Sequence, residues 1–165
     1  MSNEIMPTNA TEEIITTPED LLFGAQAQRV STLPISNDPV ELAKQVNYIN
    51  NIDHALNDVV NTTVNLVDII CQNVQVHDMN SDDDTLVTRP RTIVIDDKGV
   101  TYATTSPSFA QGLATIFQTM GQPHYDTPLP IKILKQKSNS NFEFLTANID
   151  LASPVLKNFK RSSSK

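Results

Sequence analysis

The sequence predicts a small, mostly β domain of the α+β class, because three local signals agree. Stretches rich in β-branched residues with alternating polarity indicate strands. One short helix with clear start and stop signals lies between them, over about residues 107–120. Polar turns before and after that helix indicate two hairpins. The 165 residues, 39% of them hydrophobic, fit one domain with irregular flanks.

Residues 1–37 predict a mobile acidic arm. They are rich in Thr, Pro, Asn and Glu and show no sustained periodicity, so we expect them to bury too little surface to offset an ordering cost of about 1–2 kcal/mol per residue. The exception is a helix-start signal at Pro18, which Leu21, Leu22 and Phe23 follow. These three apolar residues are the candidate partner-binding segment.

A helix and then a long strand are expected after the arm. Asp38 before Pro39 predicts a capped start, and apolar residues at three- and four-residue steps predict an amphipathic helix over residues 38–60. β-branched residues then dominate residues 62–76, where one parity contains Val64, Leu66, Ile70, Val74 and Val76. We expect an irregular strand there. Continuation of the helix from residue 60 through residue 73 is the competing interpretation.

The central helix and the two hairpins have the clearest local signals. Residues 97–99 and 138–140 have the composition of hairpin turns. Ser106 predicts the N-cap of the helix and Gly121 its end. We expect the buried face of this helix to contain Phe109, Leu113, Ile116, Phe117 and Met120.

From residue 62 onward the predicted order is strand, strand, strand, helix, strand, strand. That is the element order of the OB-fold, a five-stranded Greek-key barrel whose strand face and loops bind oligonucleotides or oligosaccharides. We therefore predict an OB-like barrel with one internal helix over residues 61–153, preceded by the N-terminal helix and the disordered arm. A basic, disordered tail is expected over residues 154–165. An open antiparallel sheet carrying a helix is the alternative fold.

The net charge of −7 hides an acidic first half and a basic second half. Residues 1–84 contain fourteen Asp and Glu against two Lys and Arg, a balance of −12. Residues 85–165 contain five acidic and ten basic residues, a balance of +5. Such asymmetry is typical of a nucleic-acid surface joined to an acidic arm, and ordinary solvated charge is the alternative explanation.

Basic residues gather on two of the predicted strands. Lys132, Lys135 and Lys137 lie on the fourth strand and its exit, where an OB-type groove would need them. Arg89 and Arg91 flank the start of the second strand. We predict that these five side chains contact nucleic acid.

Aromatic residues near the basic ones are candidates for stacking on unpaired bases. Tyr102 on the third strand is the predicted stacking residue, because its hydroxyl prefers a wet edge. Phe142 and Phe144 share a parity on the fifth strand and could stack as well, but in a chain with only 5% aromatic residues we expect them in the barrel core. His124 and Tyr125, in the Pro-rich loop before the fourth strand, are weaker candidates.

The motifs over residues 90–150 form a connected series. They are an acidic-Gly turn, a Tyr-x-Thr-x-Ser strand exit, a Phe-initiated helix that closes on Gly-x-Pro, and a Lys-rich hairpin that ends in a Leu-Thr strand. The residues concerned are Asp97, Gly99, Tyr102, Thr104, Ser106, Phe109, Gly121, Pro123, Lys132, Lys135, Leu145 and Thr146. This series resembles the small single-stranded DNA-binding proteins of bacteriophages and bacterial mobile elements, and implies an OB-type fold. The chain departs from them in its acidic first half and its basic end, since many such proteins recruit partners through an acidic C-terminal tip.

Catalytic, metal and membrane motifs are missing from the sequence. It has no phosphate-binding Gly-rich loop, no His-x-x-x-His and no Gly-x-Ser-x-Gly, so we expect neither an enzyme nor a cofactor. The loop from Asp78 mimics half of a calcium loop, but Asp83 replaces the turn glycine and Arg89 the bidentate Glu, so we expect no metal. The single cysteine, Cys71, is expected to be an inert thiol. No stretch approaches the ~20 apolar residues of a membrane span, and the acidic start is unlike a signal peptide, so we expect no membrane contact and a cytoplasmic protein, in the bacterial host if viral.

The sequence therefore predicts a non-enzymatic single-stranded DNA-binding accessory protein of phage DNA replication or recombination. The alternative is a structural or interaction protein, a virion component or a regulator of a larger protein machine, that docks through its acidic N-terminal half. The sequence does not decide whether the ligand is DNA or RNA, or whether binding has a sequence preference. It also leaves open whether the protein forms homo-oligomers and which protein, if any, the arm binds.

Overall fold

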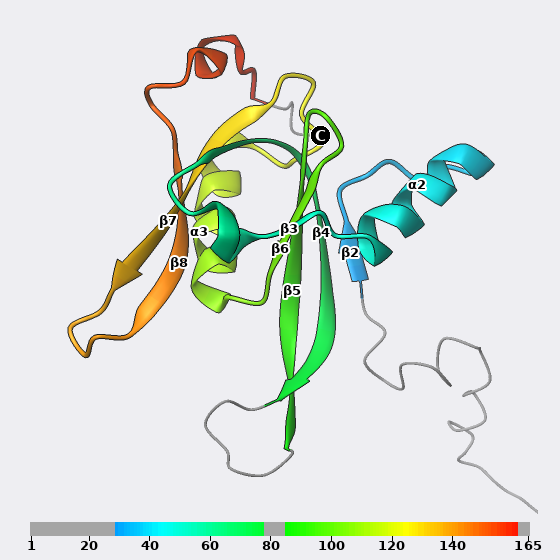
Figure 1. Ribbon diagram of the computed structural model, residues 1–165. Coiled ribbons are helices and arrows are strands. Elements are labelled where there is room, and N and C mark those ends of the chain that lie inside the picture. The colour runs from blue at the N-terminus through cyan, green and yellow to red at the C-terminus, as the bar shows by residue number, and fades with distance from the viewer. Residues whose placement is uncertain (1–28, 78–84, 162–165) are drawn as a thin grey trace, which may run out of the picture.

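The computed structural model describes residues 29–77 and 85–161 of the chain. One curved sheet of seven strands contains β2 (Arg29–Ser31), β3 (His54–Ala55), β4 (Thr63–His77), β5 (Leu86–Asp96), β6 (Thr101–Thr104), β7 (Leu129–Lys137) and β8 (Glu143–Ile149) (Figure 1). Their spatial order is β3-β6-β5-β4-β7-β8, and β2 pairs separately with β4. The helices are α2 (Pro39–Asn50) and α3 (Pro107–Met120), with 3-10 turns at Leu56–Val59 and Pro154–Asn158.

The predicted order of strand, strand, strand, helix, strand, strand is present from residue 63 onward. β4, β5 and β6 precede α3, and β7 and β8 follow it. Residues 60–73 do not continue a helix, because Thr63–His77 is the long central strand. β2 and β3 are additional to the five strands that were predicted.

The sheet is a curled half-barrel, which is consistent with an OB-like fold but open on one side. β4 pairs with β5 over most of its length and with β7 over residues 63–66, so the sheet curls around one core. Among the described strands no ladder joins β6 to β8, and α3 packs against β8 instead (Figure 1). The fold is therefore mixed α+β with a half-barrel, where the sequence predicted a five-stranded barrel.

The caps of α3 explain why its boundaries could be predicted. Ser106 Oγ accepts a hydrogen bond from the backbone N–H of Phe109 at 3.3 Å. At the other end Gly121 has a φ of 95°, and its N–H donates to the carbonyl of Phe117 at 2.9 Å. Four of the five side chains predicted on the buried face are buried, namely Phe109, Leu113, Ile116 and Phe117, and Met120 is partly buried against the main core.

A glycine lets α3 approach β8 closely. A Cβ atom added at Gly112 would lie 3.3 Å from Thr146 Oγ1 and 3.4 Å from the backbone nitrogen of Ala147. Ser108 Oγ also donates to the carbonyl of Leu145, so the helix satisfies part of the β8 edge. The helix thus closes the side of the half-barrel that strand pairing leaves open.

A β-bulge at Val67 divides β4 into two halves that face different cores. The register with β5 shifts between Leu66 and Asp68. Before the shift, Val64 and Leu66 belong to the main core inside the half-barrel, whereas Ile70 packs with residues of β5 in a second cluster. The single parity predicted for this strand is therefore wrong beyond Leu66, because one extra residue turns the later side chains to the other face.

The helix predicted over residues 38–60 ends at Asn50. The chain then runs along β6, where Asp53 N–H donates to Thr101 Oγ1 at 3.0 Å and Asp53 Oδ2 accepts from Thr101 N–H at 3.0 Å. Leu56 follows and is fully buried in the main core. These tertiary contacts stabilise the extended chain more than a helix would be stabilised here, because the Asn and Ile residues after Tyr48 have low helix propensities.

α2 packs on the outer face of the sheet through a few side chains. Tyr48 and Ile49 contact the second hydrophobic cluster, and no residue of the helix is fully buried. The exposed fractions are 61% for Val40, 45% for Leu42 and 54% for Val46. The apolar side that the periodicity predicted is therefore largely in solvent.

Part of the predicted arm belongs to the fold. The sequence predicted a mobile segment over residues 1–37, but Arg29–Ser31 forms β2 against residues 70–72 of β4. The next residue, Thr32, donates from Oγ1 to Asp68 Oδ1 at 2.8 Å and accepts from Ile69 N–H at 3.0 Å. β7 leaves β4 after residue 66, so β2 covers a stretch of β4 that would otherwise be an open edge.

The tail predicted to be disordered over residues 154–165 is folded as far as Arg161. Ser153 caps the 3-10 turn, and Phe159 packs edge-on against Tyr125 with ring centroids 5.0 Å apart. Arg161 Nε donates to the carbonyl of Thr119 in the last turn of α3 at 3.1 Å. A cation at this end of a helix is favourable, because it complements the helix dipole.

Tyr125 should make stability depend on pH in the alkaline range. Burial raises the pKa of Tyr125 to about 12, and its hydroxyl donates to the carbonyl of Gly121. The folded state favours the protonated phenol, so its contribution should be complete below the ordinary pKa of about 10 and should fall as the pH rises toward 12. Tyr125→Phe should lower the free energy of unfolding by about 1 kcal/mol near pH 9. Urea unfolding near pH 9 and pH 11 checks this, since the difference from wild type should narrow at the higher pH; a constant difference would contradict it.

Candidate nucleic-acid interface

The end of the β7–β8 ribbon presents two of the predicted lysines together. The ribbon extends from the half-barrel and ends in the turn at residues 138–142 (Figure 1). Lys135 pairs with Leu145 and Lys137 with Glu143, so both lysines lie on the same face of the ribbon. Lys135 Nζ lies 3.9 Å from Glu143 Oε1, with both side chains exposed. Such an exposed pair is weak, so both cations remain accessible.

Lys132 lies apart from these two. It pairs with Thr63 and Asn148, and strand alternation places it on the face opposite to Lys135. The hydrogen bond from Thr63, and to a smaller extent the charge of Lys132, hold the pKa of Asp150 below its usual value. The structure thus separates one lysine from the group of three that the sequence placed together.

Four hydrogen bonds hold the turn at the end of the ribbon. Ser138 N–H donates to the carbonyl of Phe142 at 2.8 Å, and Phe142 N–H donates to Ser138 Oγ at 3.2 Å. Asn141, with a φ of 65°, donates from its N–H to the carbonyl of Ser138 at 3.0 Å, and the hydroxyls of Ser138 and Ser140 lie 3.0 Å apart. These bonds therefore hold the backbone of Ser138, Asn141 and Phe142 in place.

Phe142 and Phe144 were predicted to lie in the core, and this prediction is wrong. Phe142 is 70% exposed and Phe144 is half-buried, and neither belongs to a hydrophobic cluster. Core positions on β8 have the opposite parity and are occupied by Leu145 and Ala147. The prediction failed because it rested on the small number of aromatic residues in the chain, whereas aliphatic residues fill the core face of β8.

Tyr102 lies on β6, which β5 and β4 separate from the ribbon in the order of the sheet. Its ring stacks on His54, with centroids 5.4 Å apart, and its hydroxyl donates to Asp96 Oδ2 at 3.2 Å. Burial, followed by the charges of Asp96, Asp53 and Asp97, raises the pKa of Tyr102. The aromatic ring predicted to stack on bases is therefore half-buried and stands among carboxylates.

Arg91 holds α2 to the sheet. Its guanidinium donates to the carbonyl of Ile49 at 3.3 Å and to Gln72 Oε1 at 3.0 Å, and burial lowers its pKa. Because Ile49 lies in the last turn of α2, the cation also complements the helix dipole. Arg89 lies two residues earlier on β5, opposite Val74, and is half-buried.

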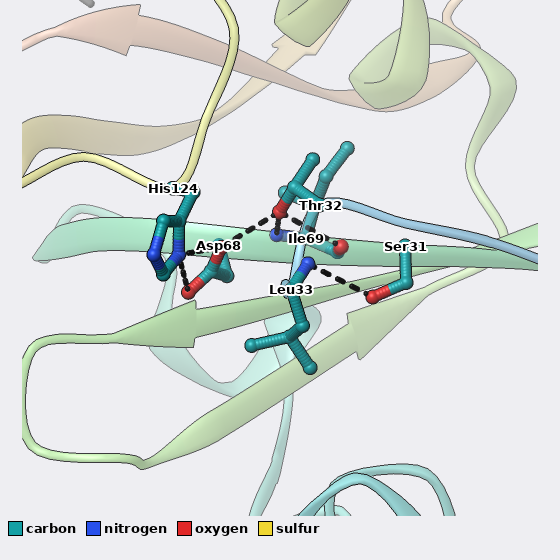
Figure 2. Close-up of polar contacts among 6 residues, drawn as sticks. All are labelled: Ser31, Thr32, Leu33, Asp68, Ile69 and His124. Carbon is teal, nitrogen blue, oxygen red and sulfur yellow. Dashed lines mark hydrogen bonds and ion pairs between the residues drawn. The ribbon is translucent and has the colours of Figure 1, made fainter. Parts of the chain in front are cut away.

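A polar cluster that the sequence did not reveal joins three distant segments (Figure 2). Asp68 is 4% exposed; it accepts from Thr32 and lies 3.1 Å from Nδ1 of His124. His124 has a positive φ of 81°, and the carbonyl of Val67 accepts from the N–H groups of both His124 and Tyr125. The sequence offers no signal for this contact of His124, because a positive φ cannot be read from a histidine in a loop. His124 and Tyr125, weak candidates for nucleic-acid contact, thus anchor the loop between α3 and β7.

Some predicted features fall beyond the described residues, and others can be placed within them. Leu21, Leu22 and Phe23 lie outside residues 29–77 and 85–161, as does the acidic loop after Asp78. Within those two ranges no group of His, Cys, Asp and Glu is arranged to hold a metal, and no helix has the length and hydrophobicity to cross a membrane. Cys71 is half-buried, and burial raises its pKa.

Replacing Arg91 should separate a structural role from a role in binding. Arg91→Met removes both hydrogen bonds and should lower the free energy of unfolding by about 1–3 kcal/mol. Hydrogen exchange in α2 should become faster, while the salt dependence of oligo-dT binding should stay unchanged. Lys98→Met, which removes a cation from the exposed turn between β5 and β6, is the control for the loss of one charge. A salt slope that falls by about 0.7 in Arg91→Met alone would instead show a phosphate contact.

A family model described as phage single-stranded DNA-binding protein matches residues 37–150 of the chain. This range contains α2, the half-barrel from β3 to β8, and α3, and therefore includes the basic ribbon. Searches of curated proteins and of solved structures found no match.

Proposed function

The chain belongs to the phage single-stranded DNA-binding protein family, and we propose that it coats or handles single-stranded DNA through the end of its β7–β8 ribbon during phage DNA replication or recombination. The observation that carries the proposal is the pair of exposed lysines, Lys135 and Lys137, on one face of a ribbon that ends in a hydrogen-bonded turn. The protein acts by binding, without catalysis or a cofactor, in the cytoplasm of the bacterial host.

The charge distribution supports the ribbon as the place where the phosphates lie. Residues 129–143 carry Lys132, Lys135 and Lys137 against Glu143, a balance of +2. The β5–β6 turn carries Asp96 and Asp97 against Lys98, a balance of −1. A phosphate backbone releases condensed counterions where it meets lysines and is repelled by carboxylates. The strand is therefore expected to approach the ribbon, with Arg89 steering it from β5.

The position of the ribbon in the fold supports the same proposal. In OB-folds the loops between the first two strands and between the last two strands flank the bound oligonucleotide. Here the loop between β7 and β8 is at the end of a hairpin that extends toward the bottom of Figure 1, as β4 and β5 also do. Tyr102 and Arg91 already have partners within the protein, so a contact of either residue with DNA would compete with those hydrogen bonds.

A protein contact through the N-terminal half is the second candidate function. The observation in its favour is the exposure of three apolar side chains of α2, Val40, Leu42 and Val46. Such a contact is compatible with DNA binding, since α2 and the ribbon lie on different sides of the molecule (Figure 1). A partner protein or a second copy of the chain would both fit this surface.

Removing the ribbon lysines should weaken binding and flatten its salt dependence. Each phosphate contact with single-stranded DNA adds about 0.7 to the slope of log K against log salt, so Lys135→Ala with Lys137→Ala should lower the slope by about 1.4. The control removes the same charge elsewhere, with Lys44→Ala and Lys98→Ala. Fluorescence anisotropy with labelled oligo-dT at several salt concentrations measures both pairs. Equal slopes in the two double variants would contradict the ribbon site, and no binding by wild type at ~50 mM salt would contradict DNA binding altogether.

Tyr102 should be tested by separating its ring from its hydroxyl. If the ring stacks on a base, Tyr102→Ala should lose about 1–3 kcal/mol of binding free energy with a nearly unchanged salt slope. Tyr102→Phe keeps the ring and loses only the bond to Asp96, so it should bind like wild type. Circular dichroism checks folding, because the ring also packs on the main core. Wild-type affinity in a folded Tyr102→Ala would remove Tyr102 from the interface.

A further inference from the structure

The exposed ring of Phe142 is unusual for this chain. At 70% exposure it contrasts with Phe109 and Phe117, which α3 buries, and with Phe159, which packs on Tyr125. Large apolar side chains in water are a cost unless a ligand covers them, and single ones do occur without a role. Exposure alone therefore does not indicate a ligand at Phe142, and the residues around it are needed to show one.

The surroundings hold the backbone of Phe142 in place beside cations. Both its N–H and its carbonyl are bonded to Ser138 across the turn, so its position does not depend on a flexible loop. The next pair of the ladder is Lys137 with Glu143. Phe142 thus lies next to the ladder pair that contains Lys137, at the end of a ribbon that is only two strands wide.

The face that Phe142 occupies is suited to bases rather than phosphates. Strand alternation places Phe142 on the same face as Gln136 and Phe144, whereas Lys135 and Lys137 lie on the opposite face. An aromatic ring and an amide can contact a base, and the flexible lysine stems can reach around the narrow ribbon to the phosphates beside it. Apolar and cationic groups are thereby divided between the two faces of one ribbon.

We propose that Phe142 is a stacking platform for an unpaired base of the bound strand, with Lys137 holding the adjoining phosphate. This inference rests on the proposed function and adds to it the residue that contacts the base. It also explains why the turn is held by four hydrogen bonds, since a stacking ring on a rigid support loses little conformational entropy on binding.

The absence of Trp from the chain makes a direct test available. Phe142→Trp introduces a single fluorophore at the proposed platform, and stacking on oligo-dT should quench its emission in a saturable way. Ile35→Trp is the matched control, because Ile35 is fully exposed in the segment between β2 and α2. We expect no quenching of Trp at position 35. Equal quenching in both variants, or none in either, would overturn the platform.

Affinity measurements complete the test and distinguish the two proposals. Phe142→Ala should bind oligo-dT about tenfold more weakly than wild type, equivalent to about 1.4 kcal/mol, with an unchanged salt slope. An abasic oligonucleotide of the same length carries the phosphates without bases, and both proteins should bind it equally. If wild type binds oligo-dT and Phe142→Ala binds it as tightly, the platform is wrong while DNA binding stands. If wild type does not bind oligo-dT, the proposed function itself fails.

Discussion

The extra residue at Val67 is the constraint on which the architecture depends. Without the shift in register, Ile70 would face the same side of the sheet as Val64 and Leu66 and would not reach the second cluster. Because of the shift, Leu66 packs in the main core and Ile70 packs in the second cluster on the opposite face. The same strand therefore contributes to the half-barrel and to the cluster on which α2 packs. The bulge also exposes the carbonyl of Val67 to the loop that leads into β7. The loop between α3 and β7 is therefore anchored to that one backbone group.

The local elements were predictable where neighbouring residues determine them. Ser106 and Gly121 mark the ends of α3, and Gly99, with a φ of 80°, marks the first hairpin, because caps and left-handed turns are decided within a few residues. The end of α2 was not predictable in this way. Asp53 leaves the helical pattern because Thr101, 48 residues later, offers two hydrogen bonds to it. The folding of residues 154–161 was missed for the same reason, since Phe159 needs Tyr125 to pack on.

The candidate site shows the same division between local and distant causes. Lys135 and Lys137 could be grouped from spacing alone, because a strand places alternate residues on one face. Lys132 has the wrong parity for that group. The involvement of Arg91 with α2 could not be foreseen either, because Ile49 lies 42 residues away in sequence. Phe142 could have been recognised as exposed by comparing its parity with that of Leu145 and Ala147, which have the alternating apolar pattern of a core face.

The two outermost edges of the sheet have a consequence for association between copies of the chain. Unpaired strand edges are templates for association between sheets, and the risk rises with local concentration. Here β8 is covered by α3, whose Ser108 occupies the carbonyl of Leu145, and the opposite edge ends in β3, which is only two residues long. These two edges therefore offer little backbone to the sheet of a neighbouring copy.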